Sequence, residues 1–269
     1  MFDILNEHEI ISRLQKNNLN YDVVYKKSTG STNADAKKNV GEKNLLVAAE
    51  KQTAGKGRYG RSFWSETDGG LYFTLKINQI NNIKLNIADI TFFPLIAAVS
   101  VSRAVSYLCD IDLSIKWPND LLYKSGSGYK KLCGILTEAS ILNKNVSYVI
   151  VGIGLNINND LSDFPGDIKN IASSLKIITG KTFSRTDILC ETVDNFTQLL
   201  PAVSQITPRR QLINEYKKNL LLDIDISFYQ NDKILKGRAA GINENGNLIV
   251  KPENGGQIIL QSGEVNFLI

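Results

Sequence analysis

The feature that most constrains this chain is a glycine-rich, basic segment set between two apolar runs. Residues 52–64 read Gln-Thr-Ala-Gly-Lys-Gly-Arg-Tyr-Gly-Arg-Ser-Phe-Trp. Residues 45–49 before it and 71–77 after it have the composition of buried strands. The segment is therefore predicted to be a loop between two strands of one sheet, where a scaffold can hold functional groups at its edge.

The composition of this loop suits a phosphate-bearing ligand. Its glycines let the backbone approach a ligand closely, and Lys56, Arg58 and Arg61 bring charge that neutralises anions. The loop matches neither the nucleotide-binding loop that ends in Gly-Lys-Ser/Thr nor the dinucleotide fingerprint. A solvated connection or a patch that binds nucleic acid non-specifically fits the same residues, so the loop alone does not decide the function.

Composition indicates an ordinary globular protein. The 269 residues, 43% of them hydrophobic, can bury a full core and suffice for one large domain and a small one. A formal net charge of +4 is mild for this length, so the overall charge does not argue for nucleic acid as the main partner.

Cysteine and histidine usage narrows the chemistry. Cys109, Cys133 and Cys190 are an odd number without a short paired spacing, which argues for a reducing compartment and against a disulfide framework or zinc site. His8 is the single histidine. No segment approaches the ~20 apolar residues that span a bilayer, and the N-terminus does not resemble a signal peptide. The sequence predicts a soluble, cytoplasmic protein with no membrane partner.

The pattern along the chain predicts an α+β protein. Helical spacing or capping residues predict helices within 1–20, 34–38, 87–108, 185–200 and 208–220. Further strands are predicted at 21–25, 115–117, 130–138 and 146–151. The 87–108 helix is almost continuously apolar, which implies a buried position.

Two glycines interrupt the strand that follows residue 146. Gly152 and Gly154 indicate that something approaches the backbone closely there, although a bulge or a tightly packed helix would explain them equally well. Residues 160–170 are polar with a Pro-Gly pair and are predicted to form an exposed loop.

From residue 222 onward the pattern changes to short strands. They are predicted at 223–228, 234–240, 248–250 and 258–260, with turns at 245–246 and 255–256. These strands predict a small β-barrel appended to the α+β domain, and we place the domains at 1–220 and 221–269.

Four blocks together are similar to the signatures of biotin protein ligases. They lie in the family's order at residues 55–61 (Gly-Lys-Gly-Arg-Tyr-Gly-Arg), 116–120 (Lys-Trp-Pro-Asn-Asp), 131–136 (Lys-Leu-Cys-Gly-Ile-Leu) and 152–156 (Gly-Ile-Gly-Leu-Asn). The resemblance runs from about Ser31 to the C-terminus. It implies a mixed β-sheet flanked by helices, like that of class II synthetases, with a C-terminal SH3-like barrel.

The chain departs from the family pattern at two loop positions. Lys56 stands where the family usually has arginine, so it keeps the charge but loses the bidentate fork. Phe63 stands where the family has tryptophan, and Trp64 follows it, so either ring is a candidate to cover adenine, with Phe63 favoured by alignment. About 28 residues precede the Ser-Thr-Asn cluster, too few for a winged helix-turn-helix, so we expect a monofunctional ligase without specific DNA binding.

The resemblance implies a two-step reaction. Biotin's carboxylate attacks the α-phosphate of ATP to give biotinyl-5'-AMP and pyrophosphate, and a lysine of a biotin carboxyl carrier protein then takes the biotinyl group. Arg58 and Lys131 are the catalytic candidates, because cations must stabilise the charge that accumulates in both steps. Mg²⁺ is expected with ATP, with Asn156 and Asp120 near its shell.

The resemblance also assigns binding residues. Biotin is expected to contact Ser31, Thr32, Gln52, Gly55, Lys56, Arg58, Lys131, Gly134 and Gly152. ATP or the adenylate is expected to contact Arg58, Arg61, Phe63, Trp64, Lys116, Asn119, Asp120, Gly154 and Asn156. The glycine-rich loop is expected to act as a lid that ligand anions order, and residues 160–170 are expected to fold over ATP similarly.

Simpler interpretations stand beside these assignments. Ser31 can be only a helix N-cap, Gln52 an exposed strand end, Lys131 a snorkelling lysine and Cys133 a small buried thiol. A lipoate or octanoate ligase is the nearest enzyme alternative, and a nucleic-acid-binding regulator is the alternative from another class. The sequence leaves monomer and homodimer equally open.

Overall fold

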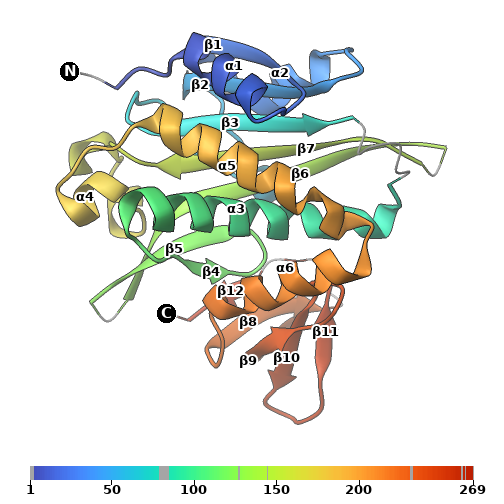
Figure 1. The fold of residues 1–269 in the computed structure, drawn as a ribbon. Coiled ribbons are helices and arrows are strands. Elements are labelled where there is room, and N and C mark those ends of the chain that lie inside the picture. The colour runs from blue at the N-terminus through green and yellow to red at the C-terminus, as the bar shows by residue number, and fades with distance from the viewer. Residues whose placement is uncertain are drawn as a thin grey trace.

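A seven-stranded mixed sheet forms the centre of the molecule in a computed structural model that describes residues 3–78, 85–126, 128–143, 145–230, 233–261, 263 and 265–268. The strand order is β1-β2-β3-β7-β6-β5-β4 (Figure 1). The strands are β1 Tyr21–Thr29, β2 Asn44–Gln52, β3 Gly70–Ile77, β4 Ser114–Lys116, β5 Asp120–Ser125, β6 Gly128–Leu142 and β7 Asn145–Asn156. Only the β1–β2 pair is parallel; the other neighbours in this sheet run antiparallel.

The glycine-rich loop joins β2 to β3, which are hydrogen-bonded neighbours in the middle of this sheet. Both strands are almost entirely buried, as their continuous apolar runs predict. The prediction that the loop bridges two strands of one sheet is therefore confirmed.

Helices cover the sheet unequally. They are α1 Glu7–Lys16, α2 Thr32–Lys38, α3 Phe92–Cys109, α4 Leu175–Thr179, α5 Arg185–Leu199 and α6 Ile206–Asn219. The long helices α3 and α5 cross one face of the sheet (Figure 1). Alternate residues of β7, such as Val151 and Ile153, pack into that main core, whereas Ile150 packs on the opposite side with Ala36 of α2. The even-numbered positions of β7 thus face the side where α2 lies.

The expectation that no segment is apolar and long enough to span a bilayer is wrong for one helical stretch. The helical stretch Ile87–Cys109 is long and apolar enough to cross a bilayer by length and composition, with a mean hydropathy of 1.6 in its most apolar window. Two thirds of that window is buried inside the fold, since α3 packs between the sheet, α5 and α6. The helix is apolar because it is buried in the core, as the sequence predicted.

The C-terminal strands form a separate small sheet below α6 in Figure 1. They are β8 Asp225–Gln230, β9 Lys233–Ile242, β10 Leu248–Pro252, β11 Ile258–Leu260 and β12 Val265–Phe267, in the order β11-β10-β9-β8-β12. The predicted turns are present, and Gly246 has the positive φ of 76° that favours glycine. The sequence analysis missed β12 and α4, which have three and five residues and show little period, and also β5, which follows directly on the Pro118-Asn119 pair.

The small sheet is packed firmly against the larger unit. Its buried residues belong to the same continuous apolar cluster as the main core. The indole Nε1 of Trp117 donates to the Gly246 carbonyl at 2.9 Å, and a side chain at Gly246 would press against Leu95. This packing brings the β11–β12 segment to the edge of the cleft described below.

A buried arginine ties the N-terminal segment to the sheet. Arg185, only 1% exposed, places Nη2 2.7 Å from Glu50 Oε2 and Nε 3.1 Å from Asp3 Oδ2, and Nη1 donates to the Gly70 carbonyl at 2.9 Å. Removing one member of such a cluster leaves uncompensated buried charge.

We expect Arg185→Leu to lower the free energy of unfolding by about 3–5 kcal/mol, because Glu50 then loses its cation in a buried site. Arg13→Leu is the matched control, since Arg13 pairs with Glu9 and Asp187 at partly exposed positions and its loss should cost about 0–1 kcal/mol. Urea denaturation of both variants measures the difference. Equal losses of unfolding free energy in the two variants would show that the buried cluster contributes no more stability than a surface ion pair.

Candidate active site

The glycine-rich loop folds into a hairpin over the sheet edge. Phe63 N donates to the Gly55 carbonyl at 2.9 Å, and Gly57 N donates to the Arg61 carbonyl at 2.7 Å. The tip is a 3-10 turn over Arg58–Gly60. A Cβ added at Gly55 would lie 2.4 Å from Ser65 Oγ, so glycine is required there by packing within the hairpin.

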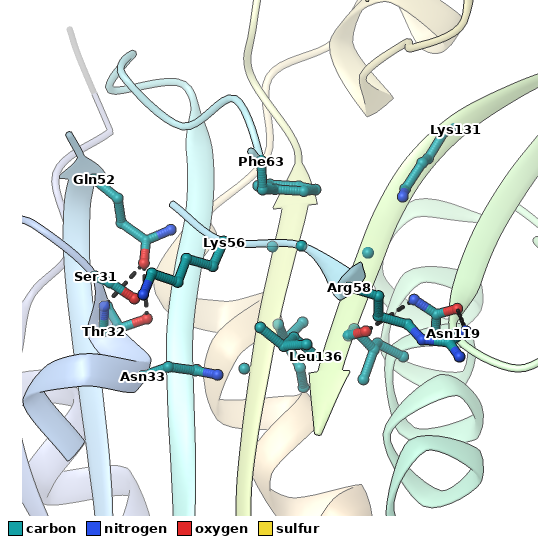
Figure 2. A pocket seen from close by; sticks show the side chains of 16 residues that line it. Ser31, Thr32, Asn33, Gln52, Lys56, Arg58, Phe63, Asn119, Lys131 and Leu136 are labelled. Atoms are coloured by element: carbon teal, nitrogen blue, oxygen red, sulfur yellow. Dashed lines mark hydrogen bonds between the residues drawn. The ribbon is translucent and has the colours of Figure 1, made fainter. Parts of the chain in front are cut away.

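Beneath this hairpin lies a pocket with two chemically different ends (Figure 2). At one end, neutral polar side chains converge from the start of α2 and the end of β2: Ser31, Thr32, Asn33 and Gln52. The other end holds Arg58, Asn119 and Lys131. The pocket therefore offers hydrogen bonds at one end, toward which the Lys56 side chain also extends in Figure 2, and the paired cations Arg58 and Lys131 at the other.

The neutral end is buried and internally hydrogen-bonded. Gln52 Oε1 accepts from Thr32 N at 2.9 Å and from Thr32 Oγ1 at 3.0 Å, and Gln52 is 8% exposed. Gln52 is thus not the exposed strand end that we kept as an alternative. Ser31 occupies the N-cap position of α2 but its side chain makes no capping hydrogen bond. Its hydroxyl, in a residue 5% exposed, remains available to a ligand in the pocket.

The cationic end is held by specific partners. Arg58 Nη1 donates to Asn119 Oδ1 at 3.0 Å, and Arg58 Nη2 donates to the Gly263 carbonyl of the small sheet at 3.0 Å. Lys131 Nζ lies 2.8 Å from Asp120 Oδ1, an ion pair without full hydrogen-bond geometry. Lys131 is therefore fixed in the pocket wall and does not simply snorkel to solvent.

A second pocket continues from the cationic end. It shares Gly57, Arg58, Phe63, Asn119 and Lys131 with the first. It adds Arg61, Lys116 and Asp120, together with Val265 and Asn266 of the small sheet. The two pockets thus form one cleft whose middle is cationic.

Electrostatics in the second pocket favour an anion. Burial lowers the pKa of Lys116, and the neighbouring charges of Lys131 and Arg61 lower it further, while Asp120 raises it. Cations crowded enough to disfavour one another's charged form are stabilised by an arriving anion. The cluster is suited to the phosphates of a nucleotide.

The glycines of β6 and β7 make room for two side chains. The Phe63 ring lies so close that a Cβ at Gly134 would be 3.0 Å from it and a Cβ at Gly154 only 2.4 Å. A Cβ at Gly152 would lie 2.1 Å from Asn33 Oδ1. Of the explanations left open by the sequence, close approach to the backbone is correct for both β7 positions.

We expect Gly154→Ala to displace the Phe63 ring, and the overpacking should cost about 1–3 kcal/mol of stability and weaken nucleotide binding. Gly128→Ala is the control, because Gly128 lies in the same sheet and nothing lies within 4 Å of its added Cβ. Chemical denaturation and nucleotide titration of both variants provide the measurement. Wild-type behaviour of Gly154→Ala would mean that Phe63 moves freely.

Most of the residues expected from the sequence do line the cleft. The first pocket contains Ser31, Thr32, Gln52, Lys56, Arg58, Lys131, Gly134, Gly152 and Gly154. The second contains Arg58, Arg61, Phe63, Lys116, Asn119 and Asp120.

Three expected residues do not line either pocket. Gly55 supports the hairpin from within. Trp64 turns away, and its Nε1 donates to the Asp163 carbonyl at 2.8 Å, so it holds the 160–170 loop. Asn156 is buried and donates to the Ser173 carbonyl at 3.0 Å. Of the two aromatic candidates, only Phe63 lies in the cleft.

Sequence reasoning missed Asn33 as a pocket residue. The signal was present in the Ser-Thr-Asn cluster, which we interpreted as helix capping. Cys133 is fully buried, and burial raises the pKa of its thiol, in agreement with an inert packing role.

Comparisons with known proteins agree with this geometry. The profile of the "Biotin/lipoate A/B protein ligase family" matches residues 22–156, just over half of the chain. The chain belongs to the biotin/lipoate A/B protein ligase family. A second profile, "Biotin protein ligase C terminal domain", matches residues 226–268, which form the small sheet.

Individual members of this ligase family align over much of the chain. It is 29% identical to the bifunctional ligase/repressor BirA of Bacillus spizizenii over 261 residues, 93% of this chain and 76% of that protein. It is 37% identical to the biotin–[acetyl-CoA-carboxylase] ligase of Paracoccus denitrificans over 133 residues, 48% and 52% of the two chains.

The biotin protein ligase from Aquifex aeolicus, solved in complex with biotin and ATP, shares the ligase fold of this chain. The two superpose with a TM-score of 0.74 at 29% sequence identity, and the match covers 91% of this chain and 98% of that one. The expected fold, a mixed sheet flanked by helices with a small SH3-like unit, is confirmed.

Proposed function

We propose that the protein is a biotin protein ligase that activates biotin as biotinyl-5'-AMP and transfers it to a lysine of a biotin carboxyl carrier protein. The observation that carries this function is the single cleft with a hydrogen-bonding end, a cationic middle and a second cationic pocket. Biotin has a neutral hydrogen-bonding ring at one end and a carboxylate at the other. ATP supplies the phosphate that must meet that carboxylate.

The residues present account for the first step. A carboxylate oxygen of biotin attacks the α-phosphorus of ATP and displaces pyrophosphate, so two anions must be brought together. Arg58 and Lys131 lie in the wall shared by the two pockets, where the new oxygen–phosphorus bond would form. In the second step the acceptor amine attacks the biotinyl carbonyl carbon and AMP leaves, with the same cations stabilising the charge on the oxygens.

Mg²⁺ fits this proposal as an ion held mainly by phosphates. Among the described residues no group of three or more His, Cys, Asp or Glu side chains could hold a metal by itself. Asp120 lines the second pocket and offers one carboxylate, whereas Asn156 lies outside both pockets. A single carboxylate suits a Mg²⁺ ion that arrives with the substrate phosphates, and Asp120 would help to hold it. When bound, the ion would neutralise phosphate charge.

The neutral end of the pocket favours biotin over the other substrates of the family. Lipoate and octanoate end in a dithiolane ring or a methyl group, neither of which offers a strong hydrogen bond. Burying the Ser31 hydroxyl, which makes no capping hydrogen bond, against such a group would leave it unsatisfied, which discriminates between ligands. The biotin ureido ring can donate and accept hydrogen bonds there.

The decisive experiment supplies the protein with ATP, Mg²⁺, biotin and a biotin carboxyl carrier domain. Mass spectrometry should show one biotinyl group on one lysine of the carrier and none on a carrier whose target lysine is replaced by arginine. Parallel reactions with lipoate and octanoate test the alternative. No transfer of biotin, or transfer of another acyl group in its place, would refute the assignment.

We propose that the hairpin at residues 53–65 is a lid that ligand anions stabilise. Its tip carries Arg58 and Arg61, whose positive charges repel each other until phosphate arrives. Biotin plus ATP should therefore slow tryptic cleavage within the hairpin by about tenfold or more, as expected when a local opening equilibrium is suppressed. Cleavage after Lys236, an exposed residue of the small sheet that precedes Gly237, is the internal control. Equal cleavage with and without ligands would exclude the lid.

The wider setting follows from the same proposal. A ligase that acts on a carrier protein and ATP would work in the cytoplasm, where its three buried thiols stay reduced. We propose that residues 1–220 carry the reaction and 221–269 support the nucleotide pocket through Val265 and Asn266. Both monomer and homodimer are compatible with the cleft, and sedimentation velocity distinguishes them.

A further inference from the structure

A chain of hydrogen bonds connects the neutral end of the pocket to an ion pair outside it. Asn33 Nδ2 donates to Glu138 Oε2 at 2.9 Å, and Lys37 Nζ donates to Glu138 Oε1 at 2.6 Å. On the other side, Thr74 Oγ1 lies 2.7 Å from Asn33 Oδ1 and 2.8 Å from Thr32 Oγ1. The chain thus runs from a surface lysine, through a carboxylate, an amide and two hydroxyls, to the pocket wall.

The Glu138 carboxylate fixes which groups donate and which accept along this series of hydrogen bonds. An ionised carboxylate only accepts hydrogen bonds, so it requires the Asn33 amide nitrogen to face Glu138 and leaves the Asn33 oxygen facing Thr74. Burial raises the pKa of Glu138, but the ion pair with Lys37, the hydrogen bond from Asn33 and the nearby charge of Lys56 together hold that pKa below its ordinary value. The charge is therefore maintained at neutral pH.

The Thr74 hydroxyl links the orientation of the Asn33 amide to Thr32 in the pocket wall. Its hydroxyl has one proton and two acceptors in reach, Asn33 Oδ1 and Thr32 Oγ1. With the amide oxygen fixed in front of it, Thr74 donates to Asn33. Thr32 Oγ1 then directs its own proton to Thr74 Oγ1 and Gln52 Oε1, which lie 2.8 Å and 3.0 Å away, and keeps its lone pairs for a ligand. Thr74 is fully buried, so water does not compete for these bonds.

The close packing at Gly152 limits the alternatives. A Cβ at that position would lie 2.1 Å from Asn33 Oδ1, so the amide fills the space above the β7 backbone. The Asn33 side chain can exchange its oxygen and nitrogen by a flip of the amide in place. Only the charge on Glu138 distinguishes the two orientations.

We propose that Glu138 is a positioning residue that sets the hydrogen-bond polarity of the biotin pocket and keeps Thr32 Oγ1 an acceptor for a ligand N–H group. This inference rests on the proposed function, which supplies the ureido N–H groups of biotin as the donors. Glu138 does not line the pocket itself and acts through Asn33 and Thr74.

The first test compares two variants of the ion pair. Glu138→Gln keeps the shape but lets the amide at 138 donate or accept, so Asn33 can flip and Thr74 can turn its proton toward Thr32. The dissociation constant for biotin should rise about tenfold, the loss of one hydrogen bond at a buried acceptor. Lys37→Met is the matched control, because the charge on the half-buried Glu138 remains, and the change should stay within about twofold. ATP binding should be unchanged in both variants.

The second test is a double-mutant cycle through the transmitting hydroxyl. In a Thr74→Val background no proton can turn toward Thr32, so adding Glu138→Gln should then change biotin affinity by about twofold or less. Isothermal titration of the four proteins with biotin gives the coupling, and thermal unfolding checks that each is folded.

The outcomes separate the inference from the function on which it rests. Wild-type protein that does not bind biotin refutes the proposed function. If wild-type protein binds biotin but Glu138→Gln binds it equally well, the inference is refuted and the function stands. Equal losses in Glu138→Gln and Lys37→Met, or an undiminished Glu138→Gln effect in the Thr74→Val background, likewise refute control of polarity and indicate a purely structural ion pair.

Discussion

Replacing Lys131 with methionine is expected to slow formation of the acyl-adenylate by about 100- to 1,000-fold, the usual effect of removing one group that stabilises developing charge. Lys131 lines both pockets, and its ammonium lies 2.8 Å from Asp120 at the point where the pockets join. Without it, biotin's carboxylate and the α-phosphate must approach each other beside an unpaired Asp120 carboxylate. Pyrophosphate release with biotin, ATP and Mg²⁺ measures the rate.

Controls separate this effect from loss of structure. The Lys131–Asp120 pair is partly exposed, so unfolding free energy should fall by only about 1 kcal/mol or less. Lys124→Met, an exposed lysine on β5, should leave the rate within about twofold of wild type. Lys131→Arg retains the charge and should recover part of the rate. A normal rate of pyrophosphate release by Lys131→Met would reduce Lys131 to a packing residue.

Arg58→Ala is expected to release the adenylate about 100-fold faster while slowing its formation less. Arg58 stands at the hairpin tip and bonds Asn119 and the Gly263 carbonyl, at 3.0 Å each, so it joins the hairpin to the β4–β5 turn and to the small sheet. Losing two charge-assisted hydrogen bonds over a cleft should open the lid more often, and these bonds are the stronger kind. Formation still has Lys131 to stabilise charge.

The measurement follows adenylate dissociation in a chase with unlabelled biotin, alongside the burst of its formation. Arg58→Lys keeps the charge without the fork and should give an intermediate dissociation rate. Thr53→Ala changes an exposed residue of the same loop that lines neither pocket and serves as the matched control. Unchanged retention of the adenylate by Arg58→Ala would mean that the hairpin is not the lid.

The outlines of this fold could be predicted because they depend on local pattern. The apolar runs at 45–49 and 71–77 predicted two buried strands, and they became β2 and β3. The cap at Ser184 and the proline near the start of α6 likewise predicted helix starts, and Ser184 does accept from Asp187 N. Periodicity failed for β12, which has three residues, and for β5, whose start at Asp120 follows directly on a Pro-Asn pair typical of a turn.

The sequence also determined, by itself, the chemical character of the site. Glycines, Arg58 and Arg61 between two strands favoured an anion-binding loop, because φ freedom and charge belong to the residues themselves. The four motif blocks, taken together and in order, identified the family because their residue types can be recognised without knowing the fold.

The tertiary structure alone decided which polar groups meet. Asn33 bonds Glu138 across 105 residues of sequence, and Arg58 bonds Gly263 across 205, and neither pairing has a local signal. Phe63 and Trp64 are neighbours of similar character, yet only packing against Gly134 and Gly154 turns the first into the cleft. Side-chain direction and hydrogen-bond polarity depend on partners that the fold brings together, and that is why they could not be read from the chain.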